Sequence, residues 1–83
     1  MLTKLTSVTR LLQARIDFAK RAYRLSLNNY RHVLDLAPTF LPDPRIGIGL
    51  CFWMLGERER AKKAWDRSVE VVSLVSLSRL NTS

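Results

Sequence analysis

Several residue types are scarce in this chain of 83 residues, and each scarcity narrows what the chain can be. Three glycines and three prolines are too few for a low-complexity or loop-dominated chain. The single cysteine, Cys51, excludes an internal disulfide, and together with the single histidine, His32, it offers no metal-binding cluster. We therefore predict no metal site and no bound cofactor.

Residue patterns typical of catalytic sites are also missing. Cys51 lies inside an apolar stretch, where a thiol packs more readily than it reacts. His32 stands without a cluster of cysteine or carboxylate ligands in a metal-site pattern. Gly47 and Gly49 are not followed by the Lys-Ser/Thr pair of a phosphate-binding loop. We predict that the chain is not an enzyme.

Acidic residues are few, because seven Asp and Glu face 14 Lys and Arg, which gives a net charge of +7. Such a charge favours acidic partners or nucleic acid through long-range attraction. The basic residues are scattered and have no interleaved aromatic residues, so we do not expect nucleic-acid binding. The apolar run Ile46–Leu55 is about half of the ~18–20 residues that a membrane span requires, so we predict none.

Helical periodicity is what the chain does have, and 47% apolar residues exclude a disordered chain. The clearest stretch runs from Asp43 to Val72 and predicts a helical hairpin. Asp43 can cap the first helix, and Pro44 suits its first position. Gly56 tolerates the left-handed backbone that ends a helix. The second helix should bury the stripe formed by Ala61, Ala64, Trp65, Ser68, Val69 and Val72.

A second copy of this hairpin is predicted upstream. A helix should begin at Tyr23 and end before Pro38, with Tyr23, Leu27, Tyr30, Leu34 and Ala37 on one stripe. A preceding helix, capped by Thr6 or Ser7, should pack through Val8, Leu11, Leu12, Ala14, Ile16, Phe18 and Ala19. Ser26 and Tyr30 precede Ala61 and Trp65 by 35 residues each, which indicates an internal repeat.

The order of small and aromatic residues resembles the tetratricopeptide (TPR) repeat, whose period is about 34 residues. The matching positions are Ile48, Gly49, Phe52, Gly56, Ala61 and Trp65. The departures are Arg45, Ser68 and Ser73 in this copy, and Asp17 and Arg21 in the upstream copy. The resemblance implies an all-α fold with two antiparallel helical hairpins of a right-handed α-solenoid. We expect a single unit over residues 1–83, with repeats at 7–40 and 42–73 and a short helical tail at 74–83.

Two segments make the resemblance more specific. The run Pro42–Trp53 and the segment Leu11–Ala19 resemble fungal versions of the large TPR scaffold subunit of the polymerase-associated-factor (Paf) complex. The resemblance implies a protein–protein interaction scaffold in a nuclear complex that travels with RNA polymerase II during transcription elongation. It also implies that this chain is a fragment or a short relative of such a subunit, with protein partners.

In TPR folds the first helix of each hairpin lines a concave groove that holds a peptide or a partner helix. By that resemblance, the partner-binding residues are Leu11, Arg15, Phe18, Ile46, Leu50, Trp53 and Met54. The same residues suit core packing or self-association, and this choice stays open.

Two other interpretations of the whole chain also stay open. The first sixteen residues contain Lys4, Arg10 and Arg15 and no acid, which fits a mitochondrial targeting segment on a small basic helical protein. The other interpretation is a truncated gene product without independent function.

Overall fold

Four helices follow one another in the computed structural model, which describes residues 2–81 and the side chains of residues 4–77. They are α1 (Leu2–Ala19), α2 (Tyr23–Leu36), α3 (Pro44–Met54) and α4 (Arg58–Asn81). The predicted all-α fold with TPR-like hairpins is confirmed. The tail expected from residue 74 continues α4, and its last two residues lie outside the described part of the chain.

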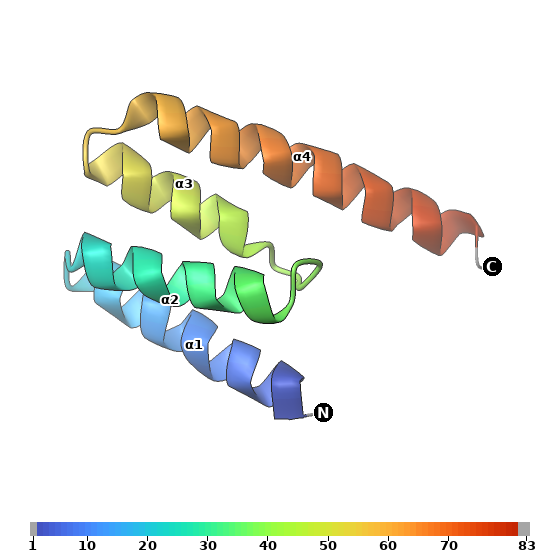
Figure 1. The fold of residues 1–83 in the computed structure, drawn as a ribbon, viewed down its shortest axis with the longest axis horizontal. Helices are drawn as coiled ribbons and strands as arrows, with labels where there is room; N and C mark the ends of the chain where they lie inside the picture. Colours follow the sequence, from blue (N-terminus) through green and yellow to red (C-terminus); the bar gives the residue numbers. More distant parts are fainter. Residues whose placement is uncertain (1, 82–83) are drawn as a thin grey trace.

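The helices lie side by side in chain order, so that α1 packs on α2, α2 on α3, and α3 on α4 (Figure 1). Each helix runs antiparallel to the one before it. The α1–α2 and α3–α4 turns therefore meet at one end of the molecule, and the α2–α3 loop lies at the other. The shortest extent of the molecule is 17 Å, which corresponds to a single layer of helices with two exposed faces.

The ends of the helices follow local chemistry. The Asp43 carboxylate accepts a hydrogen bond of 3.0 Å from the Arg45 backbone N–H, and Pro44 opens α3, as predicted. Gly56 has a φ of +83°, the left-handed conformation expected of a glycine after a helix. The predicted start of α2 at Tyr23 is confirmed. The predicted cap at Thr6 or Ser7 is wrong, because α1 already begins at Leu2.

One continuous core joins the two hairpins. Its buried apolar members are Leu11, Ala14, Leu27, Tyr30, Val33, Ile48, Cys51, Phe52 and Ala61. The helix α1 turns Ser7 and Asp17 inward with Leu11 and Ala14. This rotation leaves Val8, Leu12, Ile16 and Ala19 at the surface, contrary to the prediction.

The buried stripe of α4 is also rotated from the predicted one. Val71 is buried, whereas Val69 and Val72 are exposed. Ala61, Ala64, Ser68 and Val71 follow a spacing of 3, 4 and 3 residues, which keeps one face of a helix toward α3. The polar Ser68 therefore occupies the interior while two valines do not.

The glycines of α3 allow two aromatic rings to lie directly against its backbone. A Cβ atom on Gly49 would overlap the Trp65 indole, and a Cβ atom on Gly47 would overlap the Tyr30 ring. The Trp65 indole N–H donates a hydrogen bond of 3.3 Å to the Ile46 carbonyl oxygen. Small residues in α3 thus bring both α2 and α4 close to it.

Candidate functional site

A groove with a volume of about 280 Å³ lies between the first helices of the two hairpins. It is lined by Leu11, Arg15, Tyr30, Pro42, Asp43, Ile46, Gly47 and Leu50. Four of the seven residues predicted to bind a partner are brought together here, namely Leu11, Arg15, Ile46 and Leu50. We call this feature the α1–α3 groove.

The floor and the rim of the α1–α3 groove differ in exposure. Leu11 and Tyr30 are buried, and Tyr30 can lie under α3 because Gly47 has no side chain. Ile46 and Leu50 are 48% and 42% exposed and lie one turn apart on α3. The groove therefore combines an apolar floor with two aliphatic side chains that still face water.

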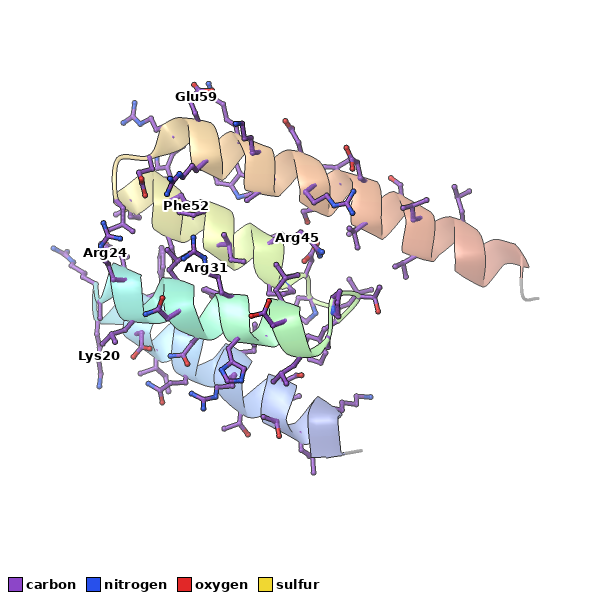
Figure 2. The ribbon with its side chains drawn as sticks, in the orientation of Figure 1. Lys20, Arg24, Arg31, Arg45, Phe52 and Glu59 are labelled. Carbon is purple, nitrogen blue, oxygen red and sulfur yellow. The ribbon has the colours of Figure 1, made fainter. Side chains whose placement is uncertain are left out.

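Asp43 places a carboxylate at one end of this groove. Its side chain is almost fully buried, and its Oδ1 atom accepts from the Arg45 guanidinium at 3.1 Å (Figure 2 labels Arg45 near the start of α3). The same guanidinium donates to the Pro38 carbonyl oxygen at 2.9 Å, which ties the loop to the helix start. The Asp43 Oδ2 atom has no hydrogen-bond partner among the described residues.

Arg15 and Tyr30 are the other polar groups of the groove. Arg15 is exposed, so its positive charge lies at the rim. Burial raises the pKa of the Tyr30 hydroxyl, nearby Cys51 adds to the rise, and the Arg15 charge opposes it. Tyr30 is therefore a neutral hydrogen-bonding group at physiological pH.

Phe18, Trp53 and Met54 do not line the α1–α3 groove. The Phe18 ring packs edge-to-face on Tyr23 at 5.2 Å. The Trp53 ring lies 5.7 Å from the Trp65 ring, beside the α3–α4 interface. Met54 is exposed near the end of α3.

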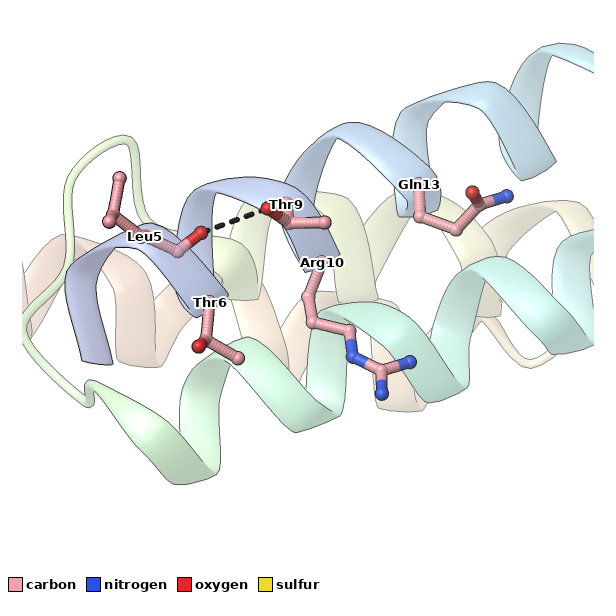
Figure 3. Close-up of a pocket in the computed structure, with 5 residues that line it drawn as sticks. All are labelled: Leu5, Thr6, Thr9, Arg10 and Gln13. Carbon is pink, nitrogen blue, oxygen red and sulfur yellow. Dashed lines mark hydrogen bonds between the residues drawn. The ribbon is translucent and has the colours of Figure 1, made fainter. Parts of the chain in front are cut away.

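Another recess, of about 430 Å³, runs along α1 and is lined by Leu5, Thr6, Thr9, Arg10 and Gln13 (Figure 3). All five residues belong to one helix, so the recess has no opposing wall. The Thr9 hydroxyl donates at 3.0 Å to the Leu5 carbonyl oxygen of its own helix. This is an open helix surface rather than a built binding site.

Cys51 is packed, as its apolar surroundings predict. Its thiol donates to the Ser26 Oγ atom at 3.4 Å, and the Ser26 hydroxyl donates to the Ala14 carbonyl oxygen at 2.7 Å. Burial raises the pKa of the Cys51 thiol, partly offset by the Ser26 contact, so the thiol stays protonated and a poor nucleophile.

The described residues form no metal cluster and no membrane span. No group of three or more His, Cys, Asp or Glu side chains is placed to share a metal ion among them. Within the same part of the chain, none of the helices combines the length and apolarity needed to cross a bilayer.

Sequence reasoning missed part of the groove. Tyr30 was expected only as a repeat aromatic, and Asp43 only as a helix cap, yet both line the groove. The signal that would have found Tyr30 is Gly47, a second small residue in α3 that no turn requires.

Comparison with known proteins finds much longer relatives. The chain is 43% identical over 61 residues, 74% of its length, to the RNA polymerase-associated protein CTR9 of Saccharomyces cerevisiae, of which it covers 6%. It is 53% identical over 55 residues, 66% of its length, to tetratricopeptide repeat protein 1 of Schizosaccharomyces pombe, of which it covers 5%. It is 34% identical over 59 residues, 71% of its length, to the CTR9 homologue of Arabidopsis thaliana, again covering 5%.

Two further comparisons gave no match. No protein-family profile matches the chain, and no solved structure matches it. One of the relatives is named as a tetratricopeptide repeat protein, which is consistent with the helical hairpins of the structure. The chain therefore folds as TPR-like helical hairpins, and its sequence is similar to a short stretch of the CTR9 proteins.

Proposed function

We propose that this chain is a protein-interaction module that acts in a nuclear assembly with RNA polymerase II, as a relative of the TPR scaffold of the Paf elongation complex. The observation that carries this proposal is the 43% identity to the RNA polymerase-associated protein CTR9 over 74% of the chain. The packed helical hairpins support a scaffold role, since their exposed faces can bind other proteins.

The α1–α3 groove is the surface we assign to the partner. Ile46 and Leu50 are about half exposed, and Leu11 lies below them, so an apolar side chain seated here would bury all three. Burying an aliphatic side chain is worth about 1.5–3 kcal/mol. An amphipathic helix or an extended apolar peptide fits this arrangement.

The polar groups of the groove add selectivity to the proposed contact. Arg15 is exposed and presents a cation at the rim, whereas the Asp43 Oδ2 atom is buried out of reach of a partner. A partner that carries a carboxylate beside its apolar residues would pair with Arg15. Phe18, Trp53 and Met54 contribute less in this proposal, because they lie outside the groove.

The experiment is to tag the chain in its own cell and identify the proteins that co-purify. The Ile46→Glu/Leu50→Glu double variant should lose RNA polymerase II and its associated subunits, because two charges would face the apolar floor. Leu25→Glu is the matched control, since Leu25 is exposed on α2 and outside the groove.

Circular dichroism should show equal helicity for all three proteins. Recovery of the same partners by the double variant would refute the groove. Recovery of mitochondrial proteins in place of polymerase-associated ones would refute the nuclear role. Sedimentation of the purified parent chain and of the same variants measures whether the groove mediates self-association.

A further inference from the structure

We propose that the end of the molecule that carries both hairpin turns binds an acidic segment of a partner protein. This surface is separate from the α1–α3 groove and goes beyond the proposed function. Its basic residues belong to three parts of the chain. They are Lys20 and Arg21 of the α1–α2 turn, Arg24 and Arg31 of α2, and Arg58 and Arg60 at the start of α4. We call this set the basic turn edge.

The fold gathers these cations because the two turns lie at the same end of the molecule. Lys20 and Arg24 flank the α1–α2 turn, and Arg24 and Arg31 extend from α2 toward α3 (Figure 2). Glu57, Glu59 and the buried Asp17 add negative charge at this end, and Asp35 lies one turn from Arg31 on α2. The six cations of the edge still outnumber these carboxylates.

Phe52 orders two of the guanidinium groups. The Arg31 guanidinium lies 5.4 Å and the Arg60 guanidinium 5.7 Å from the centre of the Phe52 ring. The two arginines belong to different hairpins, so the ring of α3 brings them together. A guanidinium held against an aromatic ring loses little further freedom when it binds a carboxylate with its planar fork.

Most of these cations have no carboxylate partner of their own. Among the described residues, Arg60 pairs with Glu57 at 3.3 Å, and Glu59 pairs with Lys62 at 3.6 Å. Arg24, Arg31 and Arg58 make no ion pair within that part of the chain; Arg58 lies over the Trp53 ring at 4.6 Å. The edge thus has unpaired positive charge available to a partner.

The position of Arg24 is unfavourable for the fold alone. Arg24 lies in the first turn of α2, which contains no acid, whereas Arg58 and Arg60 share the first turn of α4 with Glu59. Cations at the start of a helix oppose its dipole, and acids are preferred there. Local rules broken in this way are typical of binding surfaces.

The ordering of the arginines favours a carboxylate-bearing peptide over a nucleic acid. Proteins that bind single strands stack bases on aromatic rings. The Phe52 ring is only 7% exposed and has two guanidiniums over it, so it offers no stacking face. The Arg31 guanidinium, held over the ring and without an ion pair among the described residues, instead matches an Asp or Glu side chain.

The test measures binding of a fluorescently labelled 12-residue peptide of Glu, Asp and Gly by anisotropy. Arg24→Gln/Arg31→Gln should weaken binding about tenfold, because two charge-assisted contacts are lost. Lys4→Gln/Arg67→Gln removes the same net charge away from the edge and should weaken binding less than about twofold. Arg31→Lys, which keeps the charge but not the fork, should fall between them.

Equal weakening by both double variants would overturn the proposal, since only overall charge would then matter. Tighter binding of an oligouridine than of the acidic peptide would overturn it in favour of RNA. Ile46→Glu/Leu50→Glu should leave peptide binding unchanged, which separates this surface from the groove. Thermal melts of each variant verify that the fold is intact.

Discussion

The two hairpins reach the same geometry through different chemistry. In α3–α4, close approach depends on size, because Gly49 admits the Trp65 ring and Gly56 makes the turn. In α1–α2, it depends on hydrogen bonds. Asp17 is buried and accepts from Gln13 at 2.9 Å and from Asn29 at 2.8 Å. A repeat can therefore lose its usual aromatic and glycine positions when polar groups satisfy one another in their place.

The largest effect on stability should come from a substitution at Gly49, where α3 and α4 approach through the Trp65 ring. Gly49→Ala places a methyl group against the Trp65 indole, and we expect about 2–3 kcal/mol of destabilisation in chemical denaturation. Gly49→Ala/Trp65→Leu should recover part of that loss because the smaller side chain leaves room. If the destabilisation of the double variant equals the sum of the destabilisations of the two single variants, the proposed contact is contradicted.

The corresponding substitution in the α1–α2 hairpin is Asp17→Ala. It leaves the amide donors of Gln13 and Asn29 without their acceptor, and we expect a loss of about 2 kcal/mol by thermal or chemical unfolding. Asp66→Ala removes an exposed carboxylate of α4 and should change stability by less than about 0.5 kcal/mol. If both variants lose the same stability, the buried network is not what holds α1 to α2.

The two turns should respond in opposite directions. Arg21 has a φ of 63°, the left-handed conformation that Gly56 adopts in the other hairpin. Arg21→Gly should therefore stabilise the chain by about 0.5–1 kcal/mol, and Gly56→Ala should destabilise it by about 1 kcal/mol. Differential scanning calorimetry detects both shifts, and effects of the same sign would show that backbone conformation does not control these turns.

The smallest effect should be a dependence on alkaline pH shared by both hairpins. Burial raises the pKa values of Cys51 and Tyr30 above those of the unfolded chain, so the unfolded state loses these protons first. Stability should be fully present below about pH 8.5 and should fall as the pH rises through the ionisation range of thiols and phenols. The stability of Cys51→Ala should depend less steeply on pH. A dependence identical to that of the parent chain would exclude the Cys51 thiol as a cause.

Much of the fold could be predicted from the sequence because its signals are local. Asp43, Pro44 and Gly56 act on their own backbone, so the bounds of α3 could be predicted from them alone. The rotation of α1 could not be predicted, because the burial of Asp17 depends on a hydrogen bond from Asn29 of α2. Hydrophobicity alone placed Leu12 and Ile16 inside, since they are larger and more apolar than the residues that are buried.

The groove was partly predictable for the same reason. Leu11, Arg15, Ile46 and Leu50 follow from the helical register, which the repeat pattern sets. The contribution of Tyr30 depends on a contact between hairpins, with Gly47 of α3, and no spacing within one hairpin encodes it. The position of Trp53 beside Trp65 likewise depends on the packing of α4.

The Ser26 hydroxyl has a consequence for how the chain unfolds. It donates to the α1 backbone at Ala14 and accepts from Cys51 of α3, so a single buried oxygen of α2 connects three helices. In repeat proteins, cooperativity depends on how strongly neighbouring units are coupled relative to their own stability. Separating the hairpins would break the Cys51–Ser26 contact and expose the core that both hairpins share, so the chain should unfold in one transition rather than hairpin by hairpin.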